Sequence, residues 1–211
     1  MPGKYRVRLT RGTQVLETSL SVGLDRRAPF GVEDRRLQLT AVTDASDLFE
    51  RMTELTERID GLRGAVARQH AALPAQDALA MQLKAAGEKL EAIKKEIVAT
   101  TEGGAITGEE RIREHLDELF GAWNGWEGRP TPYQLDRLAV LSRELDDVKK
   151  NFERFGKDEL PGLDRSLQER HLAPLSALIS SAEPSAFAVA CVLSKGERCR
   201  GQDAAAAEHE R

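Results

Sequence analysis

Apolar and polar residues alternate in two short stretches at the start of the chain, on either side of Gly12. A glycine suits a tight turn there, because it takes a positive φ without steric cost. Period-two alternation around such a turn predicts an antiparallel β-hairpin in residues 1–24. A lone hairpin is marginal in water and no other strong strand follows, so we expect further strands of the same sheet to lie before Met1. The alternating side consists of Tyr5, Val7, Leu9, Leu16, Thr18, Leu20 and Val22.

From about residue 34 the apolar residues recur every three or four positions, as they do on one face of an α-helix. Two such stripes predict helices over about 34–71 and 75–99. Pro74 lies between them at a position that suits a helix start. The short link predicts antiparallel neighbours. The stripes are Leu48, Met52, Leu55, Ile59, Leu62 and Val66, extended backwards by Leu37, Ala41 and Ala45, and then Leu79, Leu83, Ala86, Leu90, Ile93 and Ile97.

Two further helices are predicted after a glycine-containing loop at residues 100–106. Each opens with a capping-box pattern, in which a hydroxyl and a carboxylate or amide satisfy two backbone N–H groups. The first pair is Thr107 with Glu110, and the second is Thr131 with Gln134. Gly156 is expected to end the fourth helix. The third stripe is Ile112, Leu116, Leu119 and Trp123, and the fourth is Leu138, Leu141, Leu145, Val148, Phe152 and Phe155.

Four apolar stripes cannot stay exposed, and each buries itself best against the others. We therefore predict a mostly α fold, with an antiparallel bundle of about four helices at residues 34–171 after the hairpin. The sustained spacing favours coiled-coil-like packing. The Leu-Pro-Gly-Leu segment at 160–163 is expected to cross to a short piece that ends near His171. Residues 176–211 are expected to be an irregular or disordered tail, although residues 186–193 are apolar.

Charge is distributed unevenly along the chain. The net charge is −4, yet residues 1–36 carry eight Lys or Arg against four Asp or Glu. Without an aromatic ladder beside them, these cations predict a polar hairpin face and no nucleic-acid partner. No run of 18 apolar residues occurs, so no membrane span is expected. The chain start lacks the apolar core of a signal peptide, and the localisation stays open.

The sequence contains no pattern typical of a catalytic, cofactor or metal site. None of the four histidines, His70, His115, His171 and His209, has a Glu three positions before it, as a di-iron bundle requires. Cys191 and Cys199 have no second pair to complete a zinc site. Glu109 and Glu110 follow Gly108, where a phosphate loop needs Lys and Ser or Thr. Trp123 continues the third stripe and is expected in the core. Trp126 is freer and is the candidate contact surface.

The opening residues carry a resemblance to a known family. Residues 2–9, Pro-Gly-Lys-Tyr-Arg-Val-Arg-Leu, resemble the strand entry of an immunoglobulin-like sandwich. Together with residues 160–163, they are similar in order and spacing to the C-terminal region of bacterial sortilin-like, Asp-box β-propeller proteins of glycosyl-hydrolase type. The resemblance covers about 2–175. It implies that Tyr5 hydrogen-bonds back to the chain as a tyrosine corner. Residues 25–27, Asp-Arg-Arg, lack the proline of the family's turn.

What the resemblance implies is a C-terminal accessory module without catalytic residues, because those belong to the propeller. Such parents are secreted or periplasmic. The module would act in packing, oligomerisation or partner binding, either with the rest of its parent or with another protein. Self-association through the free hairpin edge is also expected. An independent cytosolic coiled-coil adaptor is the alternative, and an enzyme with an unrecognised site between the helices is the third interpretation.

Overall fold

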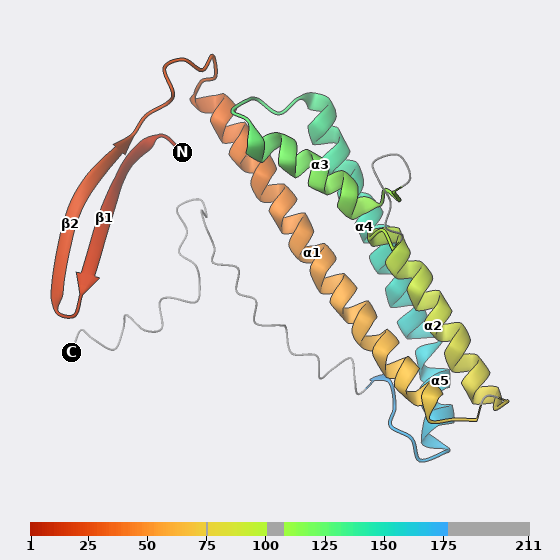
Figure 1. Ribbon diagram of the computed structural model, residues 1–211. Helices are drawn as coiled ribbons and strands as arrows, with labels where there is room; N and C mark the ends of the chain where they lie inside the picture. Colours follow the sequence, from red (N-terminus) through yellow and green to blue (C-terminus); the bar gives the residue numbers. More distant parts are fainter. Residues whose placement is uncertain (75, 101–107, 177–211) are drawn as a thin grey trace. The chain divides into compact units, whose positions relative to one another are not determined.

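The computed structural model describes residues 1–74, 76–100 and 108–176. Within these ranges the chain is mostly helical and begins with an antiparallel hairpin, so the predicted fold class is confirmed (Figure 1). The predicted tail lies almost entirely outside the described residues. The elements are β1 (Gly3–Arg11), β2 (Gln14–Val22), α1 (Val32–Ala71), α2 (Ala78–Ile97), α3 (Ile112–Gly125), α4 (Pro132–Asp158) and α5 (Leu160–Gln168).

The hairpin is regular over its whole length. β1 and β2 pair antiparallel without a bulge, from Gly3 opposite Val22 to Arg11 opposite Gln14. A two-residue loop, Gly12 and Thr13, connects them. Gly12 has φ +58°, and no other residue of the loop has a positive φ. This is the pattern of a type II′ turn, whose twist matches that of the paired strands.

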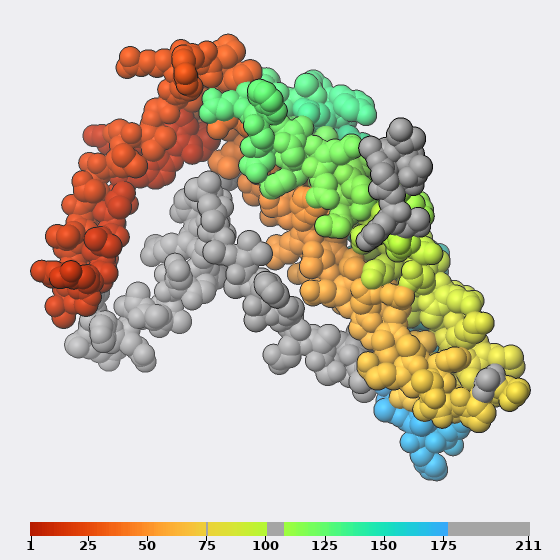
Figure 2. Space-filling model, viewed as in Figure 1, coloured from red at the N-terminus to blue at the C-terminus, as the bar shows by residue number. Residues whose placement is uncertain are grey.

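The helices pack through the predicted stripes. Helix α1 is 40 residues long, and its predicted apolar stripe runs from Leu48 to Val66. Each side chain of this stripe is at most 4% exposed. α1 contacts both α2 and α3, which follow one another along it, and α4 returns beside them. The four long helices therefore form three rods, because α3 continues in the direction of α2 instead of reversing (Figure 1). Figure 2 shows the side chains of α1 (orange) and α3 (green) in contact.

Helix starts are set by side-chain caps, and not all of them lie where the sequence predicted. Pro74 does not start α2. The helix begins after Asp77, whose carboxylate accepts a hydrogen bond from the Leu79 amide at 2.8 Å. Asp77 also receives a hydrogen bond from Arg170, and this is the main cause of its lowered pKa. A carboxylate at a helix N-terminus is favourable because it faces unpaired N–H groups.

The predicted capping box at residues 107–110 was also misplaced. Thr107 lies outside the described residues, and α3 begins only at Ile112. The Glu114 carboxylate accepts a hydrogen bond from the Arg111 amide at 3.1 Å, so the acidic half of the cap lies four residues later than expected. A one-turn error of this kind arises because several acidic residues follow one another in this stretch.

The capping box of α4 is confirmed, whereas the predicted end of α4 is wrong. The Gln134 amide donates to the Thr131 hydroxyl at 3.3 Å, and the Gln134 side chain accepts from the Thr131 amide at 2.9 Å. Gly156 does not stop the helix, which continues to Asp158. Residues 160–163 are not a crossover but the first turn of α5, which buries Leu163 and Leu167 against the bundle.

Candidate interaction surface

The two faces of the hairpin differ sharply in polarity. The register places Tyr5 opposite Leu20 and Leu9 opposite Leu16, on the same face as Val7. No described residue covers these side chains, whose exposure runs from 39% for Tyr5 to 64% for Leu16. We call this set the apolar hairpin face; its members are Tyr5, Val7, Leu9, Leu16, Leu20 and Val22. A contiguous exposed apolar surface of this kind typically marks an interaction site.

The opposite face of the hairpin is polar and basic. Lys4, Arg6 and Arg8 lie on β1 opposite Ser21, Ser19 and Glu17 on β2. Arg8 forms an ion pair with Glu17 across the strands, at 3.6 Å. Lys4 and Arg6 have no ion-pair partner among residues 1–74, 76–100 and 108–176. The face therefore carries an excess of positive charge on β1.

Two contacts fix the ends of the hairpin. The Tyr5 hydroxyl donates a hydrogen bond to the Met1 carbonyl, so the tyrosine bonds back to the chain upstream, as the resemblance implied. After β2, the Asp25 carboxylate accepts hydrogen bonds from the Arg27 guanidinium and the Arg27 amide. The Arg27 guanidinium is the main cause of the lowered pKa of Asp25. Asp25 and Arg27 therefore stabilise the turn before α1.

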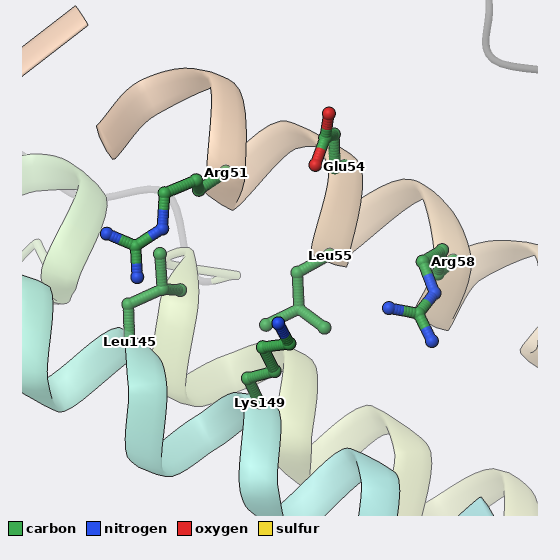
Figure 3. A pocket seen from close by; sticks show the side chains of 6 residues that line it. All are labelled: Arg51, Glu54, Leu55, Arg58, Leu145 and Lys149. Carbon is green, nitrogen blue, oxygen red and sulfur yellow. The ribbon is translucent and has the colours of Figure 1, made fainter. Parts of the chain in front are cut away.

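The bundle offers one small cavity between α1 and α4, with a volume of about 70 Å³ (Figure 3). Its cationic side chains are already engaged. Arg51 donates to Asp146 at 2.5 Å, and the Arg58 guanidinium lies 5.3 Å from the centre of the Phe152 ring. Pockets that bind small molecules are usually several-fold larger. We therefore interpret this cavity as a packing defect between two helices. It is lined by Arg51, Glu54, Leu55, Arg58, Leu145 and Lys149.

A larger and shallow groove of about 680 Å³ lies between α1 and α2. Its floor is apolar at Val66 and Leu83, and charged side chains form its rims. Several of these charges are paired: Arg63 with Glu91 between the helices, and Lys84 with Glu88 at 3.9 Å. Among the described residues of its lining there is no Ser, Cys or Thr that could act as a nucleophile.

The candidate residue Trp126 lies just after α3 and is 81% exposed. Trp123, one turn earlier, is 3% exposed and belongs to the core, as predicted. Sequence reasoning missed a second exposed aromatic residue, Tyr133, which is 76% exposed in the first turn of α4. Tyr133 directly follows the proline at the start of α4 and lies outside the apolar stripe of that helix. These two features of the sequence could have predicted its exposure.

Sequence reasoning also missed Gln38, which holds the connection between α3 and α4 in place. Its side chain is 8% exposed, and its amide nitrogen donates to the carbonyls of Trp123 and Trp126. Its amide oxygen accepts from Arg35. Counting back from Leu48 in steps of three and four reaches Gln38, so the periodicity contained the signal. The extension of the stripe to Leu37 was wrong, because Leu37 is only partly buried.

Among the described residues, no group of three or more His, Cys, Asp or Glu side chains could hold a metal ion. The Nδ1 atom of His115 lies 3.9 Å from the Glu110 carboxylate. Cys191, Cys199 and His209 lie outside the described residues. None of the described helices combines the length and hydropathy needed to cross a membrane. No family model, curated protein or solved structure matches this chain.

Proposed function

We propose that this chain is a non-catalytic accessory module whose hairpin completes a β-sheet with strands from outside this chain, either those of a parent protein or those of a partner. The observation that carries the proposal is the uncovered apolar hairpin face, on strands in which every residue is exposed. The helices, in contrast, bury their stripes in one continuous core. A two-stranded ribbon needs further strands or a packed helix for stability. The bundle would then act in packing, oligomerisation or partner binding.

Several local features support a parent of the sortilin-like, Asp-box β-propeller type. The order of hairpin, turn and helical bundle is the one that the resemblance implies. The Tyr5 hydroxyl bonds to the Met1 carbonyl in the manner of a tyrosine corner. A strand pair of nine residues each, with one apolar face, has the proportions of a sandwich component. In such a parent the glycosyl-hydrolase chemistry would belong to the propeller.

One observation favours a second candidate, an independent coiled-coil adaptor with the hairpin as a cap. The core of α1 to α5 is built from this chain's own residues, so the bundle does not depend on another polypeptide for its fold. In the adaptor, the apolar hairpin face would be covered by this chain itself. The two candidates therefore differ in what they predict for the hairpin of the purified protein.

Light scattering after size-exclusion chromatography, together with binding of an apolar dye, distinguishes the two. The full chain should bind the dye and self-associate with rising concentration, whereas a chain lacking residues 1–24 should be monomeric and bind no dye. A monomeric full chain that binds no dye would overturn sheet completion and favour the adaptor. An in-frame coding sequence before Met1 with Asp boxes would identify the proposed parent. Hydrolysis of chromogenic glycosides by the chain alone, abolished by replacing one carboxylate, would refute a non-catalytic role.

A further inference from the structure

The two outer edges of the hairpin expose different residues to a partner strand. In a hairpin closed by a two-residue loop, the flanking pair is hydrogen-bonded, and so is every second pair from there. Arg11 and Gln14 flank the loop and form the first hydrogen-bonded pair. The pairs that alternate with the hydrogen-bonded ones direct their N–H and C=O groups away from the hairpin, toward its outer edges. The outward-directed residues are Lys4, Arg6, Arg8 and Thr10 on β1, and Val15, Glu17, Ser19 and Ser21 on β2.

These two edges differ in charge. Three of the four outward-directed residues on β1 are cationic, while β2 has a single charge, Glu17, which Arg8 already pairs. No backbone hydrogen bond from elsewhere in the described residues reaches either edge. Side chains that lie opposite each other on adjacent strands attract when their charges are opposite and repel when they are alike. The β1 edge therefore favours a partner strand with negative charges. The β2 edge, with one charge that is already paired, has a much weaker preference.

A second copy of the same β1 edge is a poor partner. Any antiparallel register that overlaps three or more outward-directed residues of two β1 strands places a cation opposite a cation, for example Lys4 opposite Arg8. Natural sheets use lysine and arginine on edges to prevent such pairing. Here Lys4, Arg6 and Arg8 occupy successive alternate positions of β1, on the face opposite the apolar hairpin face. The cations that oppose pairing between two β1 strands favour pairing with an acidic strand.

We infer that the β1 edge receives a strand of another polypeptide with Asp or Glu at alternate positions and apolar residues between them. The acidic side chains would lie beside Lys4, Arg6 and Arg8. The intervening apolar side chains would then extend the apolar hairpin face, since successive side chains of a strand point to opposite sides. This inference rests on the proposed function, because it names the edge and the chemistry through which the sheet is completed.

The test adds a nine-residue peptide of alternating Glu and Val to the full chain, and measures amide exchange by NMR. N-methyl groups on the peptide edge that faces away prevent the peptide from stacking on itself. The amides of Lys4, Arg6, Arg8 and Thr10 should become protected, and a peptide with Lys in place of Glu should bind at least about fivefold more weakly. Equal affinity for the two peptides would overturn the inference.

Variants with equal charge changes locate the effect. Arg6→Glu reverses a charge on the row that faces the acidic side chains, and it should weaken binding of the Glu peptide about five- to tenfold. Arg6→Gln should lie between that variant and the native chain. The control Arg11→Glu makes the same charge change on the other face of the hairpin and should alter binding less than about twofold. Equal losses for Arg6→Glu and Arg11→Glu would contradict pairing at this edge.

The outcomes also separate this inference from the proposed function. Protection of Val15, Glu17, Ser19 and Ser21 by the peptide would overturn the choice of edge and still support sheet completion. Protection of the outward-directed amides on both edges of the monomeric chain, before any peptide is added, would overturn sheet completion itself.

Discussion

The hairpin and the bundle are both amphipathic, but among the residues that the structure describes, only the bundle has partners for its apolar side. On α1, Ile59 and Leu62 are at most 1% exposed, because the stripes of α2 and α4 meet them. On the hairpin, Leu9 and Leu16 are 62% and 64% exposed, although they lie directly opposite each other. Cross-strand pairing aligns two apolar side chains but cannot remove them from water. Helices supply each other's cover, whereas a two-stranded ribbon must obtain it from elsewhere.

The difference assigns separate roles to the two regions. Apolar burial stabilises the bundle by about 25 cal/mol per Å² removed from water. The same gain is not realised on the hairpin, so it remains available for an interaction. The bundle therefore has a finished core, and the hairpin is part of an unfinished sheet.

The largest effect is expected in the bundle core. Leu145→Ala removes a side chain that is 2% exposed at the seam between α4 and α1, and it should lower the free energy of unfolding by about 2–5 kcal/mol. Val7→Ala on the hairpin is the matched comparison and should cost far less, because Val7 is 46% exposed. Urea denaturation followed by circular dichroism measures both. Equal losses at the two positions would show that the hairpin is covered.

The next effect is expected at Gln38. Gln38→Leu removes the side-chain donor from the Trp123 carbonyl, where the hydrogen bond is buried, and from the Trp126 carbonyl, where it is partly buried. This should cost about 1–3 kcal/mol of unfolding free energy. Gln82→Leu, on the exposed side of α2, makes the same chemical change without burial and should be close to neutral. A neutral Gln38→Leu would mean that the connection between α3 and α4 is held by other contacts.

A smaller, pH-dependent effect is expected at Asp60, which joins α1 to α2. Partial burial raises its pKa, but hydrogen bonds from Lys94 and Arg63 outweigh this and lower the pKa below its ordinary value of 3.8. A carboxyl with a lowered pKa in the folded state stabilises the fold above its unfolded pKa, and this is lost as the pH falls through the folded value.

The free energy of unfolding is expected to fall below about pH 4 as carboxylates such as Asp60 become protonated. Asp60→Asn should therefore make this decrease smaller. The side chain is 41% exposed, so solvent screening limits the effect to less than about 1 kcal/mol. Asp136→Asn, at an exposed position of α4 without an ion pair among the described residues, is the control. Identical acid unfolding of Asp60→Asn and the native chain would rule out this contribution.

The smallest effect on bundle stability is expected from removing the hairpin altogether. A chain that lacks residues 1–24 should unfold at the same urea concentration as the full chain, because the core consists of helix side chains and Leu175. Thermal and urea unfolding of both chains would check this. A clear drop in the midpoint would show that the hairpin contributes to the core.

Much of this fold could be predicted from the sequence, because the hairpin and the helices have short-range periodic signals. Gly12 and the strand alternation specified the hairpin, and the stripe from Leu48 to Val66 specified α1. The direction of α3 could not be predicted, since it depends on which seam buries Leu116 and Trp123 best. The end of α4 and the start of α5 were also missed, because Leu160 and Leu163 continue the burial past Gly156.

The candidate surface was only partly predictable. The apolar side of the hairpin followed from alternation, but its lack of cover depends on the whole chain. Trp126 was predicted as an exposed contact residue. The periodicity of α1 reaches Gln38, but the hydrogen-bond partners of its buried amide cannot be predicted from that spacing. Those partners lie 85 and 88 residues away.

Hydrogen exchange of the isolated full chain, resolved by residue with NMR, would show whether the bundle is a finished core while the hairpin is uncovered. Amides in the core of the bundle, such as those of Ile59, Leu83 and Leu141, should exchange only through global unfolding. The inward-directed amides of Val7 and Leu16 should exchange within about tenfold of an unstructured chain, since an isolated hairpin is marginally stable. Hairpin amides protected as strongly as those of the bundle would contradict the account, because a covered and finished sheet would need no partner.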